Sequence, residues 1–251
     1  MKHRLKLVLL GAAAFVLFLL VTFPAEYAYK NIQSRIKPLY LSSINGTLWN
    51  GSAGAVQYRS THLGELIWSL HPHDFIRGHM ETDFSLASSE LETKGTIGKE
   101  IFGTAYAKNI EGYLPAALFG SQIGLKNFTA AGNLHFSMQR MEFSPKGRLE
   151  SAVGTITWEQ AGISSPAQVI LGNLNVLVTT EKEGIVFNIS DENSPIKVKA
   201  DLLVCPDGKY ELNGKLTPTT AAKEGLSKSL ALLGKADKNG VIKIKYAGRL
   251  K

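Results

Sequence analysis

Apolar and polar residues alternate with a period of two along most of the chain from Ser42 onward, and glycine, proline, asparagine and aspartate interrupt the alternation at intervals. Successive side chains of a strand point to opposite faces of a sheet, so this pattern predicts antiparallel strands with one apolar and one solvated face. In the clearest run, which begins at Ile196, the polar face carries Lys197 and Lys199. Other strands are predicted around residues 80–86, 134–138, 155–158, 174–178, 185–189, 210–216 and 242–246.

Two dipeptides predict tight turns between strands. Asp207-Gly208 separates the run after Ile196 from the strand that begins near Tyr210, and Asn239-Gly240 precedes the last strand. Both residues of such a dipeptide tolerate positive φ, as the two central positions of a hairpin turn require.

Two segments predict helices instead. A short apolar run follows Pro115, which suits the first turn of a helix. In residues 219–233 apolar residues recur at spacings of three and four, and Gly234 stands where a helix would stop. This second segment predicts an amphipathic helix that lies on a sheet.

The amino-terminal segment differs from the rest of the chain. Leu7 to Phe23 is a run of 17 residues without a charge. At about 1.5 Å per residue it reaches the lower limit for crossing roughly 30 Å of hydrocarbon, and it exceeds the apolar core of an ordinary signal peptide. A cleaved signal peptide is the alternative, but cleavage after Ala25 or Ala28 would place Phe23 or Glu26 where a small residue is required. We therefore predict a membrane anchor.

The charges around this run predict its orientation. Lys2, Arg4 and Lys6 precede it and Glu26 is the first charge after it, so the short end should stay in the cytoplasm. Tyr27 and its neighbour Tyr29 either lie at the membrane boundary or pack on the following domain.

The predicted fold class is mainly β: a single transmembrane helix followed by a large, twisted antiparallel sheet with one or two short helices. An open curved trough, a sandwich and a barrel all fit the pattern. The predicted layout is a cytoplasmic N-terminus at 1–6, a transmembrane helix at 7–23, a juxtamembrane segment at 24–37 and a periplasmic β domain at 38–251.

The formal net charge of +7 suggests nucleic acid until its distribution is examined. Residues 1–6 carry +3, residues 7–196 carry 13 basic and 16 acidic side chains, and residues 197–251 carry 12 basic and 5 acidic. The charge therefore sits at the two ends, and a periplasmic domain meets no nucleic acid. A solvated face explains the carboxy-terminal lysines, and a surface for an acidic partner or anionic bilayer is the alternative. This possible partner face comprises Lys197, Lys199, Lys243 and Lys245.

Catalytic patterns do not emerge from the sequence. Cys205 is the single cysteine, so it forms no internal disulfide, and its position before Pro206 is typical of a strand end. His71, His73 and Asp74, with His79 nearby, form a local cluster that could bind a metal or support hydrolysis. Pro72 interrupts the strand geometry, however, and no third ligand has a convincing spacing. We therefore predict neither an enzyme nor a metal or cofactor site.

Several short motifs, taken in order, carry a family resemblance. They include the stretch from Ile44 to Ala53, Ile67 to Pro72 followed by Gly78, Gly154 to Trp158, and Leu230 to Gly234. In this order after an anchor, they resemble the type II secretion system protein N family, also called general secretion pathway protein N. The residues that carry the match are Gly46, Thr47, Trp49, Gly51, Trp68, Pro72, Trp158, Gly172, Asp207, Gly208, Tyr210 and Gly234.

The resemblance implies a single-pass inner-membrane component of the apparatus that moves folded proteins from the periplasm through the outer membrane. We expect a non-enzymatic accessory scaffold whose partners are other secretion components and the inner membrane. The alternative function is lipid handling, because an open sheet with one apolar face could hold acyl chains. The tryptophans are expected to fill the core or a groove beside glycines that let strands approach closely.

Overall fold

A computed structural model describes residues 2–120, 129–165, 169–192, 194–219, 237–238 and 240–249. The chain forms two compact units, Met1–Ser89 and Glu90–Lys251. Every strand pair within each unit is antiparallel, and strand order follows sequence order, as short hairpin connections require. The expected antiparallel β architecture is confirmed.

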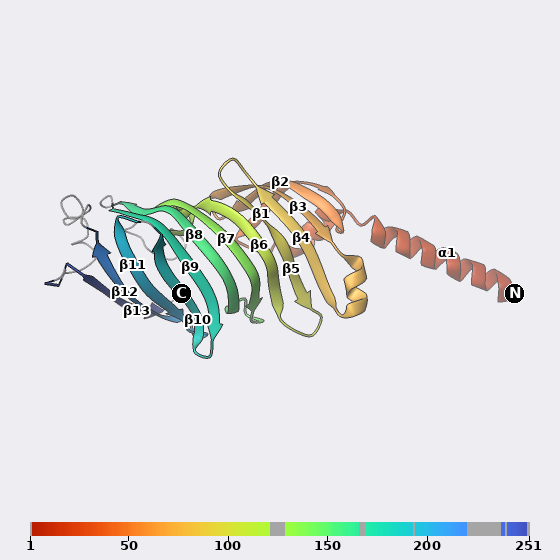
Figure 1. Ribbon diagram of the computed structural model, residues 1–251. Coiled ribbons are helices and arrows are strands. Elements are labelled where there is room, and N and C mark those ends of the chain that lie inside the picture. The colour runs from red at the N-terminus through yellow and green to blue at the C-terminus, as the bar shows by residue number, and fades with distance from the viewer. Residues whose placement is uncertain are drawn as a thin grey trace. The chain divides into compact units, whose positions relative to one another are not determined.

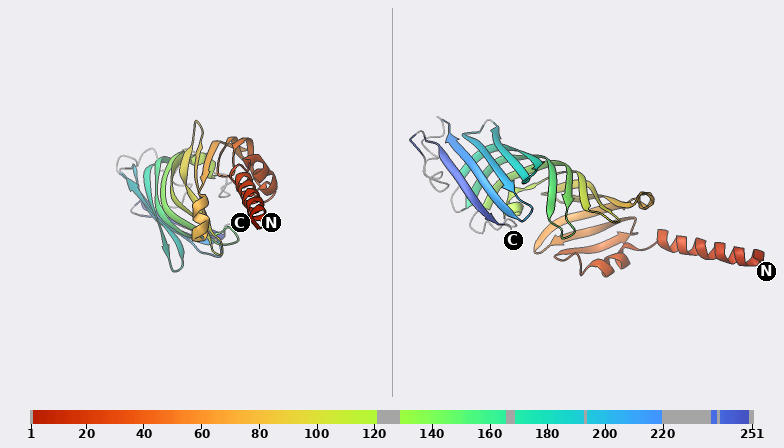
Figure 2. Two further views of the ribbon diagram at one scale, coloured as in Figure 1. Left: turned by 90° about the vertical axis from the view of Figure 1, so that its right-hand side faces the viewer. Right: turned by 90° about the horizontal axis from the view of Figure 1, so that it is seen from below.

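The first unit contains two helices, a 3-10 helix and four strands. Helix α1 (Lys2–Val21) includes Arg4–Val21, which is long and apolar enough to cross a membrane and is not buried by the rest of the protein. Helix α2 (Ala25–Ile32) follows immediately and lies beside β1, and Figure 2 shows both helices. The strands are β1 (Leu39–Gly46), β2 (Asn50–Tyr58), β3 (Thr61–Leu70) and β4 (His79–Ala87), and the 3-10 helix η1 (Pro72–Arg77) joins the last two.

The second unit contains nine strands among its described residues, and Figure 1 shows them as a curved sheet. Strand β13 pairs there with β12, so the sheet is open at this edge and is a trough rather than a closed barrel. The elements are β5 (Glu92–Glu100), β6 (Ala105–Pro115), α3 (Ala116–Gly120), β7 (Thr129–Phe143), β8 (Leu149–Ser165), β9 (Val169–Glu181), β10 (Gly184–Glu192), β11 (Ile196–Val204), β12 (Lys209–Pro218) and β13 (Ile242–Arg249).

One face of the second sheet forms its core. On β11, Ile196, Val198 and Ala200 are buried while Lys197 and Lys199 are exposed, as the alternation predicts. The short helix expected behind Pro115 is α3, whereas the helix predicted at 219–233 lies mainly outside the described residues. The core cluster consists of Ala161, Leu174, Ile196, Val198, Leu216 and Ile242, and Trp158, Leu171, Ile189 and Ile244 pack against it.

The turn between β11 and β12 differs in detail from the expected one. Only Gly208 has a positive φ, of 85°, and Asp207 does not. The Gly208 N–H donates to the Cys205 carbonyl at 2.9 Å, and the Cys205 N–H donates to the Lys209 carbonyl at 2.8 Å. The loop is therefore longer than a two-residue hairpin turn and ends in a left-handed glycine, a common alternative. Cys205 follows the end of β11, as expected, and is a free thiol.

Candidate functional site

The residues from Gly46 to Gly51 connect β1 to β2, and we call them the junction loop. Gly46 has a φ of 84°, and a Cβ at this position would lie 2.5 Å from the Asn50 carbonyl oxygen. The Thr47 N–H donates to that carbonyl at 2.8 Å, and the Asn50 N–H donates to the Thr47 hydroxyl at 3.1 Å. A glycine at 46 is required here because the left-handed backbone and the close approach both exclude a side chain.

The junction loop holds the end of helix α1. The Trp49 indole Nε1–H donates to the Leu20 carbonyl at 2.7 Å, and the Leu48 N–H donates to the Phe23 carbonyl at 2.9 Å. The last carbonyls of a helix have no partner within the helix, so these bonds satisfy groups at and just beyond the carboxy-terminal end of α1. The loop therefore attaches the apolar helix directly to the first two strands.

A second tryptophan supports the loop from β3. The Trp68 Nε1–H donates to the Leu48 carbonyl at 3.1 Å, and the Leu70 N–H donates to the Trp49 carbonyl at 2.6 Å. A Cβ at Gly51 would overlap the Trp68 indole ring, so only glycine lets the indole lie flat against β2. Both tryptophans are half-buried rather than fully enclosed.

The juxtamembrane tyrosines have different environments. Tyr29 is buried, and its hydroxyl accepts the Leu41 N–H at 3.0 Å, so this residue packs on the first strands. Tyr27 is 60% exposed. Of the two possibilities that the sequence left open, packing on the following strands is therefore observed for Tyr29.

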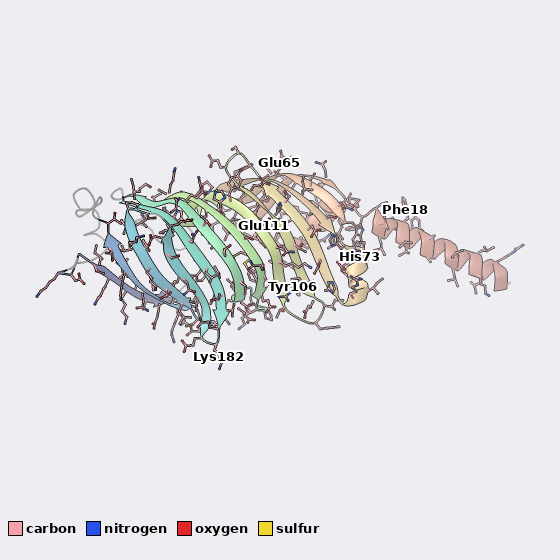
Figure 3. The ribbon with its side chains drawn as sticks, viewed as in Figure 1. Phe18, Glu65, His73, Tyr106, Glu111 and Lys182 are labelled. Atoms are coloured by element: carbon pink, nitrogen blue, oxygen red, sulfur yellow. The ribbon has the colours of Figure 1, made fainter. Side chains whose placement is uncertain are left out.

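A polar cluster lies beside the junction loop. Pro72 is the first residue of η1, and Phe75 on η1 packs edge-on against Trp49, with ring centroids 6.2 Å apart. The structure brings together His71 and Asp74, which the sequence singled out, and adds Glu81 from β4. Figure 3 labels His73 on η1, beside β4. Sequence spacing missed Glu81 because nine residues, which include the 3-10 helix, separate it from His71.

The family-motif residues of the second unit support its core and turns. Trp158 donates from Nε1 to the Ala131 carbonyl at 2.8 Å. Gly172 has a φ of 93°, and Ser194 would collide with any Cβ there. Tyr210 is the second residue of β12, and its ring would collide with a Cβ at Gly248. Gly234 lies outside the described residues.

Asp207, in the turn before β12, is bonded to residues of β12 and β13. Its Oδ1 accepts the Lys209 N–H at 3.0 Å, and its backbone carbonyl accepts two hydrogen bonds from the Arg249 guanidinium, at 3.1 and 3.2 Å. The Lys209 backbone amide, followed by the Lys209 side chain, lowers the pKa of the Asp207 carboxyl below its ordinary value of 3.8. The turn therefore favours the charged carboxylate.

The proposed partner face lies on the solvated side of β11 to β13. Strand register places Lys199 opposite Lys215 and Lys215 opposite Lys243. We call these three residues the lysine row. Lys245 lies opposite Asn213 in the neighbouring row, and Lys197 pairs with Asp191 at 3.2 Å. The sequence did not single out Lys215 because cross-strand neighbours depend on register, which alternation alone does not determine.

The polar side of the second sheet is also hollowed. Lys197, Lys199 and Lys215 line a groove together with Asp201 and Thr217, and side chains from β8, β9 and β10 complete it. Its lining combines the lysines with carboxylates, amides, hydroxyls and apolar side chains such as Leu177.

Together these features define an antiparallel β protein with a single amino-terminal apolar helix, which is bonded to the sheet through a glycine- and tryptophan-containing loop. Residues 37–245 match the family described as Type II secretion system (T2SS), protein N, and the chain belongs to this family.

Relatives of similar length share this assignment. The chain is 24% identical to the Type II secretion system protein N of Aeromonas hydrophila over 255 residues, covering 100% of both chains. It is 26% identical to that of Vibrio cholerae serotype O1, again over 100% of both, and 27% identical to that of Klebsiella pneumoniae over 99% of this chain and 97% of the relative. No solved structure matches the chain at a significant level. The chain is therefore a component of the type II secretion system, as its motifs indicated.

Proposed function

We propose that this protein is a non-enzymatic accessory scaffold of the secretion system, anchored in the inner membrane by α1. In this proposal residues 1–6 are cytoplasmic, 7–23 cross the membrane, 24–37 lie at its surface and 38–251 are periplasmic. The observation that carries the proposal is the bonding of the α1 end to the junction loop. Hydrogen bonds between the folded domain and the end of the apolar helix support an anchor over a cleaved signal. The charges of Lys2, Arg4 and Lys6 support the orientation.

The lysine row supplies the partner surface. Like charges directly opposite on neighbouring strands repel each other, and Lys199, Lys215 and Lys243 follow one another across three strands. An acidic surface placed over the row would relieve this repulsion and guide encounter with another component. The partner we propose is therefore an acidic periplasmic face of a secretion component.

Site-specific photocrosslinking in the native envelope tests the partner surface. A photoreactive residue at position 199 or 243 should crosslink to another secretion component. The matched control places the photoreactive residue at position 182, because Lys182 is exposed in the hairpin between β9 and β10 (Figure 3). This control should give no crosslink to a secretion component. Equal crosslinking at 182 and 199 would refute the assigned surface.

Secretion itself tests the scaffold role. Replacing Lys199 and Lys243 with glutamate should reduce secretion of type II substrates several-fold, whereas Lys182→Glu should not. Unchanged secretion after deletion of the gene, in an organism that uses the system, would overturn a required role.

Lipid handling is the second candidate, and one observation favours it. The apolar side of the second sheet continues across neighbouring strands, where Ile156 faces Val176, Val176 faces Ile189, and Ile189 faces Ala200. Such a face must be covered by protein or lipid. Native mass spectrometry of the purified chain should show bound lipid if this candidate is correct, and protein free of lipid would exclude it.

A further inference from the structure

The polar cluster on η1 and β4 has the composition and geometry of a metal site. We propose that His71, Asp74 and Glu81 bind one divalent transition ion of the zinc class. Their ligand atoms all lie within 4.8 Å of one another. His71 precedes η1, Asp74 lies within it and Glu81 lies on β4, so an ion at this point would join the two elements.

The separations fit ligands that share one ion. Two ligand atoms about 2.0–2.1 Å from a tetrahedral zinc lie about 3.4 Å from each other. The distance between His71 Nδ1 and Asp74 Oδ2 is 3.5 Å. The Glu81 carboxylate lies within 4.8 Å of both other ligand atoms, and its flexible side chain can close the remaining gap. The backbone already supports this approach, because the His71 N–H donates to the Glu81 carbonyl at 2.9 Å.

The second ring nitrogen of His71, Nε2, lies beside a carboxylate, as is usual for a metal-bound histidine. His71 Nε2 lies 3.1 Å from Asp83 Oδ2, on the side away from Asp74. A metal-bound histidine usually donates its second ring N–H to a carboxylate, which fixes the tautomer and turns the lone pair toward the ion. With the proton held on Nε2 by Asp83, the Nδ1 lone pair of His71 points at Asp74.

Two more histidines lie against the other carboxylate oxygen of Asp74. His73 Nε2 and His79 Nε2 lie 3.3 Å and 3.7 Å from Asp74 Oδ1. His79 is the better placed for a fourth ligand, because its side chain is 28% exposed whereas that of His73 is 65% exposed. Imidazole nitrogens select zinc, copper or nickel over magnesium and calcium, which prefer oxygen ligands.

The buried carboxylate of Asp74 favours binding of a cation in this cluster. Its side chain is 6% exposed, and a buried carboxylate is costly unless it is paired or coordinates a metal. The Arg77 guanidinium lies 3.8 Å from Asp74 Oδ1 but is 71% exposed, so this contact is solvated and weak. A divalent ion between Asp74, His71 and Glu81 compensates the buried charge more completely.

Binding is tested on the full chain purified in detergent and stripped with a chelator. Titration calorimetry should show one Zn²⁺ per chain, with Mg²⁺ binding at least tenfold more weakly. His71→Gln and Asp74→Asn should each weaken Zn²⁺ binding at least tenfold. His135→Gln is the matched control, because His135 makes an equivalent pair with Glu159, at 3.4 Å, in the second unit. This variant should bind Zn²⁺ as the parent does.

Two further measurements keep the test decisive if Asp74→Asn does not fold. Glu81→Gln should also weaken Zn²⁺ binding, and saturating Zn²⁺ should raise the melting temperature of the parent but not of His71→Gln. X-ray absorption of the zinc-loaded parent should show nitrogen and oxygen ligands at about 2.0 Å, including imidazole. Absence of stoichiometric Zn²⁺ binding by the parent would overturn the proposal, as would unchanged binding by His71→Gln and Glu81→Gln or equal affinity for Mg²⁺.

Discussion

The core cluster of the second unit and the junction loop of the first are stabilised in different ways. In the second, period-two alternation places apolar side chains on one face, and burial of residues such as Leu174 and Ile196 holds the strands together. In the first, the described contacts around the junction loop are hydrogen bonds from indoles and amides to backbone carbonyls. The core cluster of the second unit depends on apolar area removed from water, whereas the junction loop of the first depends on hydrogen bonds between specific residues.

This difference predicts which substitutions should lower stability most. A core tolerates exchange of one apolar residue for another of similar volume, whereas a loop that requires a left-handed glycine or an indole donor does not. The predictions below test the contrast by hydrogen exchange, which reports on each unit separately.

The largest effect is expected for Leu174→Ala in the second unit. Leu174 is 3% exposed within the core cluster, so its truncation should cost about 2–5 kcal/mol. Hydrogen exchange should accelerate in β9 to β12 and not in β1 to β4. Leu177→Ala is the control, because Leu177 lies on the same strand, is 50% exposed and should change stability by about 0.5 kcal/mol or less. Equal effects of the two variants would contradict the assigned faces of β9.

Gly51→Ala should destabilise the junction loop. The new Cβ would overlap the Trp68 ring and lie 2.8 Å from the Asn45 carbonyl oxygen, and overpacking of this kind costs about 3 kcal/mol. Urea unfolding in detergent measures this loss of stability, and hydrogen exchange in β1 to β3 shows where it occurs. Gly54→Ala, on the same strand, meets Ser43 Cβ at 3.1 Å and should cost less than about 1 kcal/mol. A Gly51 variant as stable as the Gly54 variant would show that the indole can move aside freely.

Trp49→Phe should loosen the α1 junction without unfolding the strands. Phenylalanine keeps the contact with Phe75 but loses the bond to the Leu20 carbonyl, a loss of about 1 kcal/mol. Limited proteolysis near residues 22–25 should accelerate. Trp158→Phe loses the equivalent bond to Ala131 in the second unit and should leave cleavage at the junction unchanged. Unchanged cleavage in the Trp49 variant would show that the indole bond does not hold the helix end.

The smallest effect concerns the pH dependence of the turn at Asp207. Because the Lys209 amide lowers the pKa of this carboxyl, its stabilisation is present above the ordinary value of 3.8 and is lost as the pH falls through the lowered pKa. The urea midpoint of Asp207→Asn should be slightly below that of the parent at neutral pH and should converge with it in strong acid. A difference that grows on acidification would contradict the assignment.

The parts of the fold that follow from local pattern could be predicted from the sequence. The faces of β11, the apolar helix and the short helix behind Pro115 all depend on residues close together in the chain. The open edge at β13 could not be predicted, because alternation is the same in a trough, a sandwich and a barrel.

The candidate sites needed information that only strand pairing provides. Leu70 lies opposite Thr82, so continuation of the β3–β4 register past Leu70 brings His71 to Glu81. Lys215 joins Lys199 and Lys243 for the same reason. The tryptophans and glycines of the junction loop were identified from motif order, but their bonds to Leu20 and Phe23 arise from contacts between distant segments.

The hydrogen bonds at the end of α1 also bear on the distance between the membrane and the first strands. Trp49 and Leu48 donate hydrogen bonds to the Leu20 and Phe23 carbonyls, so the end of the apolar helix is fixed directly to the junction loop. If α1 spans the bilayer as proposed, the junction loop rests at the membrane surface, and the first strands stand at a constant height above it. A domain attached in this way keeps a fixed distance from the membrane, whereas a domain on a flexible tether would sample a range of distances.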